Sequence, residues 1–197
     1  SPIKTVYIQS QPEWTALVVN KDSNIKSLKD LKGKKIAATK GTDPFLFTLQ
    51  ALDTIGLGKR DVELVHLQHP DGKTAFERKQ VDAWAGLDPL MASAQAQSGA
   101  KLLYRNVSFN SYSVLSVKDQ FAKSSPEAIE AVIKAYEQAR KWAKANPDKL
   151  AELLAREAKL PIEVAKLQLS RTNLDQNIPT AKHIAALQKA GSILTEE

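Results

Sequence analysis

Short apolar runs alternate with helical stretches between Lys35 and Tyr104, and this alternation constrains the fold more than any other feature of the sequence. Buried strands are predicted for four runs, 35–38, 62–67, 83–87 and 101–104. Helices are predicted between them over 44–55, 74–79 and 88–97. Strands that alternate with helices predict an α/β fold with a parallel-type sheet flanked by helices.

The flanks of this block have a different pattern. The runs 3–8 and 16–19 predict two strands before it, and 113–117 predicts a further strand after it. After this last strand the chain is predicted to be helical, with a long helix capped at Ser125. A proline stands at each predicted helix start: Pro126, Pro147, Pro161 and Pro179. The α/β block is therefore followed by a helical tail.

The composition argues against several classes of protein. The 197 residues include no cysteine, so the chain has no disulfide framework and no thiolate nucleophile or metal ligand. The formal charge is +6, but basic residues are interleaved with acids, as in 26–32, so no nucleic-acid partner is predicted. A mildly positive field would instead help to gather anionic ligands. The sequence contains no run of about 18 apolar residues that could span a membrane.

Sequence motifs of common enzyme classes are also missing. No two of the histidines, His66, His69 and His183, have the i, i+4 spacing of a helical metal-binding pair. The sequence has no nucleophile elbow, no Walker loop and no dinucleotide-binding fingerprint. We therefore predict a binding protein rather than an enzyme, with no catalytic residue, metal site or cofactor.

Two segments resemble those of a known family. The run IKSLKDLKGKKIA at 25–37, followed by KGT at 40–42, resembles the entry into the second lobe of type II periplasmic binding proteins. The run FERKQVDAWAGLDP at 76–89 looks like a signature of the aliphatic sulfonate, taurine and nitrate binding proteins of ABC importers. The resemblance covers nearly the whole chain.

This resemblance implies two lobes joined by two crossing strands, with the ligand in the cleft between them. Lobe I would comprise 1–20 and 110–197, and lobe II would comprise 21–109. The family begins with a strand–helix–strand segment ahead of the point where this chain starts, so lobe I is expected to be incomplete, with a helical C-terminal tail. An open sheet edge would then invite dimerisation or strand exchange.

The resemblance also implies a function. The chain is expected to be the extracytoplasmic component of an ABC importer, periplasmic or lipid-anchored outside the cell. It would capture a small organic anion such as an aliphatic sulfonate, taurine or nitrate. Its partners would be this ligand and a membrane permease.

The first candidate site is the loop of Lys40, Gly41, Thr42 and Asp43. A strand end, a glycine turn and a helix start place free backbone N–H groups together, which attracts an anion. The alternative is that Asp43 only caps the helix. Its carboxylate would repel a sulfonate, which favours a zwitterionic ligand such as an amino-sulfonate, or a ligand that is not an anion.

The other candidate ligand-binding residues are Gln11, Trp14, Trp84, Asp88, Asn110 and Ser111. Trp84 and Asp88 belong to a strand and the loop after it, and α/β sheets bind ligands beyond the carboxyl ends of their strands. The alternatives are core packing for Trp84 and a helix N-cap for Asp88. Trp14 would supply an aromatic wall.

Two alternative functions are also consistent with the sequence. One is the thiamin-precursor branch of the same superfamily, whose members bind or synthesise pyrimidine precursors. The other is the effector-binding domain of a transcription regulator. A signal peptide encoded upstream of Ser1 would support transport, whereas a helix-turn-helix would support regulation.

Overall fold

The computed structural model describes residues 2–195. Its strands are β1 (Ile3–Pro12), β2 (Thr15–Val19), β3 (Lys35–Ala37), β4 (Glu63–Val65), β5 (Ala83–Leu87), β6 (Lys101–Tyr104), β7 (Ser113–Lys118) and β8 (Thr172–Asn173). Its α-helices are α1 (Asp43–Asp53), α2 (His69–Glu77), α3 (Leu90–Ser98), α4 (Asp119–Ser124), α5 (Pro126–Ala145), α6 (Pro147–Ala158), α7 (Ile162–Leu169) and α8 (Ala181–Thr195). Short 3₁₀ turns are η1 (Leu28–Leu31), η2 (Lys59–Asp61) and η3 (Val107–Phe109).

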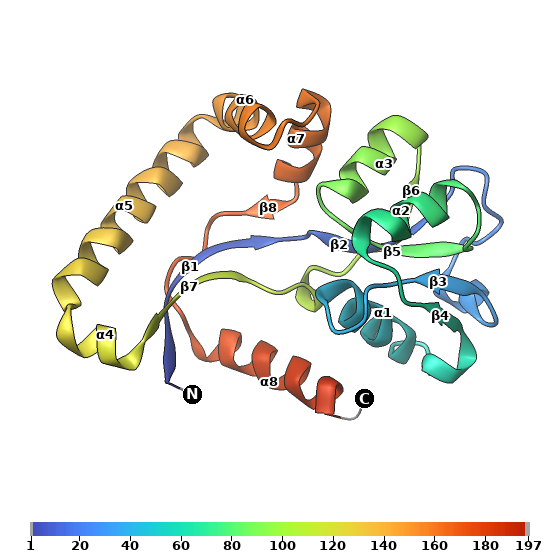
Figure 1. Ribbon diagram of the computed structural model, residues 1–197, viewed down its shortest axis with the longest axis horizontal. Coiled ribbons are helices and arrows are strands. Elements are labelled where there is room, and N and C mark those ends of the chain that lie inside the picture. The colour runs from blue at the N-terminus through green and yellow to red at the C-terminus, as the bar shows by residue number, and fades with distance from the viewer. Residues whose placement is uncertain (1, 196–197) are drawn as a thin grey trace.

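A five-stranded sheet of order β4-β3-β5-β2-β6 forms one part of the molecule (Figure 1). Strand β3 runs parallel to β4 and β5, whereas β2 runs antiparallel to β5 and β6. Four strands thus share one direction and β2 opposes them. The predicted α/β fold is confirmed, and the sheet is mixed because β2 enters it from outside the alternating block.

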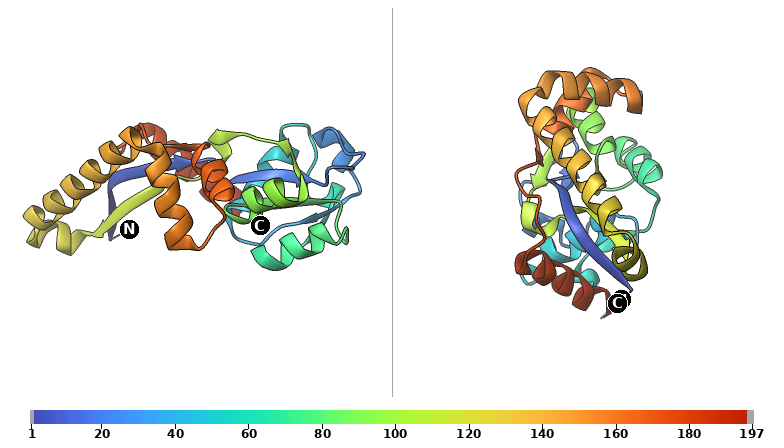
Figure 2. Two further views of the ribbon diagram at one scale, coloured as in Figure 1. Left: turned by 90° about the horizontal axis from the view of Figure 1, so that it is seen from above. Right: turned by 90° about the vertical axis from the view of Figure 1, so that its left-hand side faces the viewer.

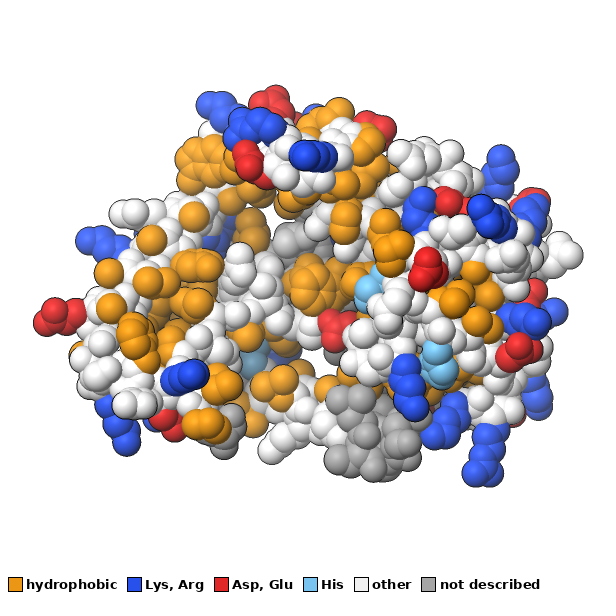
Figure 3. Space-filling view, viewed as in Figure 1, with side chains coloured by type: hydrophobic (Ala, Val, Ile, Leu, Met, Phe, Trp, Pro, Cys, Tyr) orange, Lys and Arg blue, Asp and Glu red, His pale blue; other side chains and the backbone are white. Residues whose placement is uncertain are grey.

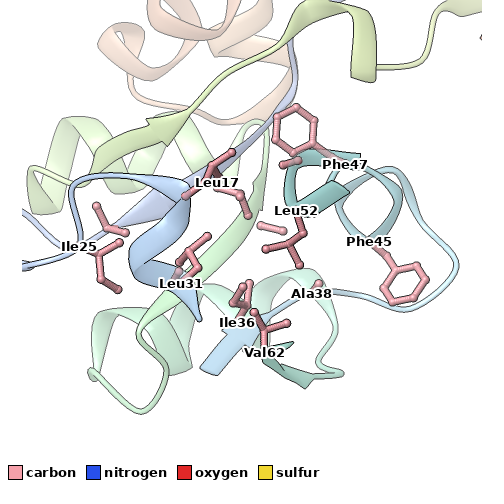
Figure 4. Close-up of a cluster of buried hydrophobic side chains, with 14 residues drawn as sticks. Leu17, Ile25, Leu31, Ile36, Ala38, Phe45, Phe47, Leu52 and Val62 are labelled. Carbon is pink, nitrogen blue, oxygen red and sulfur yellow. The ribbon is translucent and has the colours of Figure 1, made fainter. Parts of the chain in front are cut away.

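Each face of this sheet covers its own apolar core. Leu17, Leu31, Ile36, Phe47 and Leu52 pack together on the α1 face (Figure 4). The opposite face, covered by α2 and α3, buries Val18, Phe76, Trp84 and Met91. Neighbouring residues of a strand point to opposite faces, which is why Leu17 and Val18 belong to different cores. Each such side chain contributes about 1.5–3 kcal/mol through burial.

A second sheet has the order β7-β1-β8. Strand β1 pairs antiparallel with β7 from Ile3 opposite Lys118 to Ser10 opposite Ser113. The end of β1 pairs with the two residues of β8. The β1–β2 segment and the returning η3–β7 segment run side by side between the two sheets (Figure 1).

Strand pairing refines where the chain crosses between the sheets. Strand β2 lies inside the five-stranded sheet, so 15–19 is hydrogen-bonded to strands of the 21–109 region. The chain enters this sheet at Thr15 and leaves it after Tyr104, and η3 lies between β6 and the returning segment at Asn110. The outward crossing therefore lies about five residues before position 20, and the division into lobes at 1–20, 21–109 and 110–197 stays a prediction.

The helices after β7 pack against both parts of the molecule. Helix α5 contacts β1, α6 packs on α7, and α7 packs against α3 of the other part (Figures 1 and 2). Pro126 and Pro147 are the first residues of α5 and α6, as predicted. Helices α7 and α8 begin one and two residues after Pro161 and Pro179. The short helix α4 lies in the part predicted to be helical, whereas the two-residue strand β8 was not predicted.

Candidate functional site

A cavity of about 600 Å³ lies between the two crossing strands, α1 and α8. The space-filling view shows an opening above α8, near the centre of that face (Figure 3). Its apolar walls come from four segments: Ile8 of β1, Leu46 of α1, Val114 of β7, and Ile184 and Leu187 of α8. Cavities of roughly 300–1,000 Å³ with mainly apolar walls are typical of small-molecule sites.

Asp43 connects α1 to both crossing segments at the edge of this cavity. It is the first residue of α1, and its Oδ2 accepts a hydrogen bond from Trp14 Nε1 at 3.0 Å. The hydroxyl of Ser111 donates to the same oxygen. Trp14 precedes β2 and Ser111 precedes β7, so a single carboxylate oxygen joins three parts of the fold.

Asn110 fixes the two crossing segments to each other. Its side chain is buried, and its Oδ1 accepts from the backbone N–H of Thr15 at 2.8 Å. Its Nδ2 donates to the carbonyl oxygens of Asn106 at 3.1 Å and Thr15 at 3.3 Å. Asn110 therefore lines the cavity, but its amide serves the backbone of the crossing segments.

The α8 wall is organised around His183. Its Nδ1 accepts from the backbone N–H of Thr180 at 2.9 Å, and its Nε2 lies 2.8 Å from Gln176 Oε1. This pattern requires the neutral ring with the proton on Nε2. The ring packs edge-on against Tyr112, with centroids 4.5 Å apart. Gln176 Nε2 in turn lies 3.4 Å from Oε1 of the buried Gln11.

Asp88 lies outside the cavity, in a buried ion pair with Arg171. Arg171 Nε and Nη2 each donate to the carboxylate at 2.7 Å. The two side chains are only 1% and 6% exposed, and Ala92 N–H adds a bond at 2.9 Å. Burial raises the pKa of Asp88, although the bonds from Arg171 act in the opposite direction. Asp88 thus joins α3 to the segment after α7.

Trp84 and the start of the 40–43 loop also lie elsewhere. Trp84 is 1% exposed and packs against Phe76 with ring centroids 5.7 Å apart, so it is a core residue. Lys40 and Gly41 are exposed at the turn and do not line the cavity. The Thr42 hydroxyl donates to the carbonyl of Thr39 at 2.6 Å.

The structure brings together four of the ten predicted residues, Trp14, Asp43, Asn110 and Ser111. It connects Gln11 to the α8 wall through Gln176. The α8 wall, in particular His183, Ile184 and Leu187, was not predicted from the sequence. The available signal was a Thr180 three residues before His183, a capping-box spacing in which histidine takes the usual place of glutamate.

The arrangement of histidines and carboxylates and the character of the helices bear on metal binding and membrane spanning in the part of the chain that the structure describes. Among residues 2–195, the histidines, aspartates and glutamates include no group of three arranged to hold a metal ion. In the same part of the chain, no helix has the length and apolar character needed to cross a bilayer.

Comparison with known proteins gives a family and several relatives. The family model described as NMT1/THI5 like matches residues 1–150. A predicted aliphatic sulfonates-binding protein of Escherichia coli strain K12 is 29% identical over 91% of this chain. The protein of that name in Bacillus subtilis strain 168 is 34% identical over 70% of this chain.

A solved structure supports the same relationship. The periplasmic aliphatic sulphonate binding protein SsuA from Escherichia coli superimposes with a TM-score of 0.91 over 99% of this chain, at 27% identity. The chain covers 64% of that structure, and 56% and 42% of the Escherichia coli and Bacillus subtilis relatives. It therefore spans about half the length of the curated relatives it matches.

Proposed function

Because the chain belongs to the NMT1/THI5-like family, we propose that it binds a small sulfonate in the cavity between the crossing strands, α1 and α8. The observation that carries this proposal is the cavity itself. It lies where both crossing segments meet the first turn of α1, and its volume and apolar walls suit a small organic molecule.

The sulfonate class rests on the names of the relatives and on charge. The relatives are named for binding aliphatic sulfonates. An alkyl chain would contact the side chains of Leu46, Val114 and Leu187. The net charge of +6 favours the approach of an anion, and Lys4 lines the cavity.

Binding without catalysis fits the groups that line the cavity. Asp43 is hydrogen-bonded by Trp14 and Ser111, His183 by Thr180, and Lys4 lies 3.6 Å from Asp119. Asp43 Oδ2 and His183 Nδ1 are thus occupied by bonds within the fold, and Lys4 forms a surface ion pair. The proposed role is therefore capture and release of an unchanged ligand.

The wider proposal is that the protein serves an ABC importer. In this role the protein lies outside the cytoplasm, closes around its ligand by a hinge motion and delivers it to an ABC permease. The two crossing segments are the candidate hinge, since they connect the two sheets.

Calorimetric titration of the full-length protein tests the ligand class. The panel is ethanesulfonate, butanesulfonate, taurine, nitrate and an aminopyrimidine. We expect saturable binding of at least one sulfonate with one site per chain. Binding of the aminopyrimidine alone would instead support the thiamin-precursor alternative, and binding of nitrate alone would contradict the sulfonate class.

A further inference from the structure

Asp43 has one carboxylate oxygen with no partner in the described chain. Trp14 Nε1 and the Ser111 hydroxyl both donate to Oδ2. No donor among the side chains and backbone groups that the structure describes, which leave out the side chains of 189 and 193–195, forms a hydrogen bond to Oδ1. Asp43 also lines the cavity, so this carboxylate belongs to the surface that a ligand meets.

The first turn of α1 is poorly equipped to hold an anion. Pro44 has no N–H group, so one of the donors that a helix start normally offers is missing. The Thr42 hydroxyl is directed to the carbonyl of Thr39 at 2.6 Å. The Asp43 carboxylate adds a negative charge at the same place. Each of these features favours a cationic group over a sulfonate at this end of the cavity.

The positive side chain of the cavity is on another segment. Lys4, near the start of β1, is the one lysine or arginine among the described cavity-lining residues. The described cavity-lining residues therefore include an acidic residue on α1 and a basic residue on β1, whose Nζ lies 3.6 Å from Asp119. Apolar side chains such as Leu46 and Val114 also line the cavity.

From this arrangement we infer that Asp43 determines specificity by accepting a hydrogen bond from a protonated amine of the ligand at Oδ1. The inference rests on the proposed function and narrows it to sulfonates that carry an amine. The Oδ2 bonds to Trp14 and Ser111 hold the carboxylate in place, so the ligand meets an acceptor that is already oriented. An unsubstituted alkanesulfonate offers no donor to Oδ1 and is repelled by its charge.

The test compares matched ligand pairs on the full-length protein by calorimetry. The pairs are ethanesulfonate with 2-aminoethanesulfonate, and propanesulfonate with 3-aminopropanesulfonate. Charge-assisted bonds are among the stronger ones, so we expect the amino compound of each pair to bind at least about tenfold more tightly.

Variants then assign this preference to one residue. Asp43→Asn keeps an oxygen acceptor for Trp14 and Ser111 but removes the charge, and it should reduce the preference at least about tenfold. Asp53→Asn makes the same change at the exposed far end of α1 and should leave the preference intact. Thermal unfolding checks that both variants are folded. The ratio of affinities within each ligand pair, measured on the wild type, tests the amine preference even if a variant does not fold.

The outcomes separate the inference from the proposed function. Equal binding within each wild-type pair overturns the inference and leaves sulfonate binding in place. An unchanged preference in Asp43→Asn also overturns it. Binding of 2-aminoethanesulfonate and of simple alkylamines with equal affinity supports the inference and overturns the sulfonate class. Failure of every amine and every sulfonate to bind overturns both.

Discussion

Single residues hold the two sheets of this molecule together through contacts between distant parts of the sequence. Asp88 and Arg171 are the most buried of these pairs, and their side chains are almost fully removed from water. A buried charge is tolerated because it is paired and hydrogen-bonded, and removing one partner leaves the other with an uncompensated desolvation cost. Removing one partner should therefore destabilise the protein by more than the intact pair stabilises it.

Arg171→Met should destabilise the protein by about 3–5 kcal/mol, because Asp88 loses its buried counter-charge. Lys166→Met is the matched control, since Lys166 pairs with Asp148 at 3.1 Å on the exposed surface. Its cost should stay below about 1 kcal/mol. Urea unfolding measures both, and equal losses in the two variants would contradict the role assigned to the buried pair.

The Glu137 carboxylate should make the free energy of unfolding depend on pH. Hydrogen bonds from Arg140, Tyr7 and Asn177 hold the pKa of Glu137 at about 2, below its ordinary value of 4.5. The folded state thus favours the carboxylate. The stabilisation that the ionised Glu137 adds to the folded state is therefore present above about pH 4.5. It is lost as the pH falls from there towards 2.

Urea unfolding at pH 3 and pH 6 tests this dependence. Glu137→Gln should lose less stability than the wild type between pH 6 and pH 3, because glutamine does not titrate. Glu130→Gln, at an exposed position of the same helix, should lose as much as the wild type. A Glu137→Gln variant with the wild-type pH dependence would show that this carboxylate is not the group responsible.

At the scale of elements, local patterns predicted most strands and helices, because periodicity and proline or glycine punctuation act over a few residues. The placement of β2 was not predictable in the same way. Its apolar run is typical of a strand in either sheet, and only its pairing with β5 and β6 decides between them. The Asp88–Arg171 contact joins residues too far apart in the sequence for any local signal.

Prediction of the site was also limited to local sequence signals. Asp43 was a candidate because of its place at a helix start, and that reasoning is local. Its bonds to Trp14 and Ser111 depend on how the crossing segments lie beside α1. Trp84 could equally have faced a cleft, and its burial against Phe76 follows from the packing of α2 on the sheet.

Helix α8 is the element whose stability depends most directly on one side chain of the cavity. His183→Ala removes the acceptor for Thr180 N–H at the start of α8 and the edge contact with Tyr112. Loss of a helix cap costs about 0.5–2 kcal/mol, so amide exchange in α8 should accelerate about 2- to 30-fold. Hydrogen exchange measures this directly, with the exposed Lys182→Ala as control. Equal exchange in both variants would contradict the capping role.

At the scale of the whole molecule, β7 is an edge strand of its sheet in the described chain. Unpaired strand edges invite pairing with another chain. Val114 on β7 and Phe121 on the following helix α4 are exposed apolar side chains. The 197-residue chain should therefore dimerise or exchange strands when studied by itself.

Light scattering after size exclusion tests this expectation across protein concentration. Val114→Lys adds a charge to the edge strand and should shift the chain towards the monomer. Val132→Lys makes the same change on the exposed surface of α5 and should not. A monomeric wild-type chain at high concentration would contradict the prediction.

The location and the ligand class are the central claim, and one titration tests both. Ala186 lines the cavity, whereas its neighbour Ala185 on α8 does not. The full-length wild type and Ala185→Trp should bind the preferred sulfonate with equal affinity, and Ala186→Trp should lose that binding because the indole fills the cavity. Undiminished binding by Ala186→Trp would place the site elsewhere, and a wild type that binds no sulfonate would refute the claim.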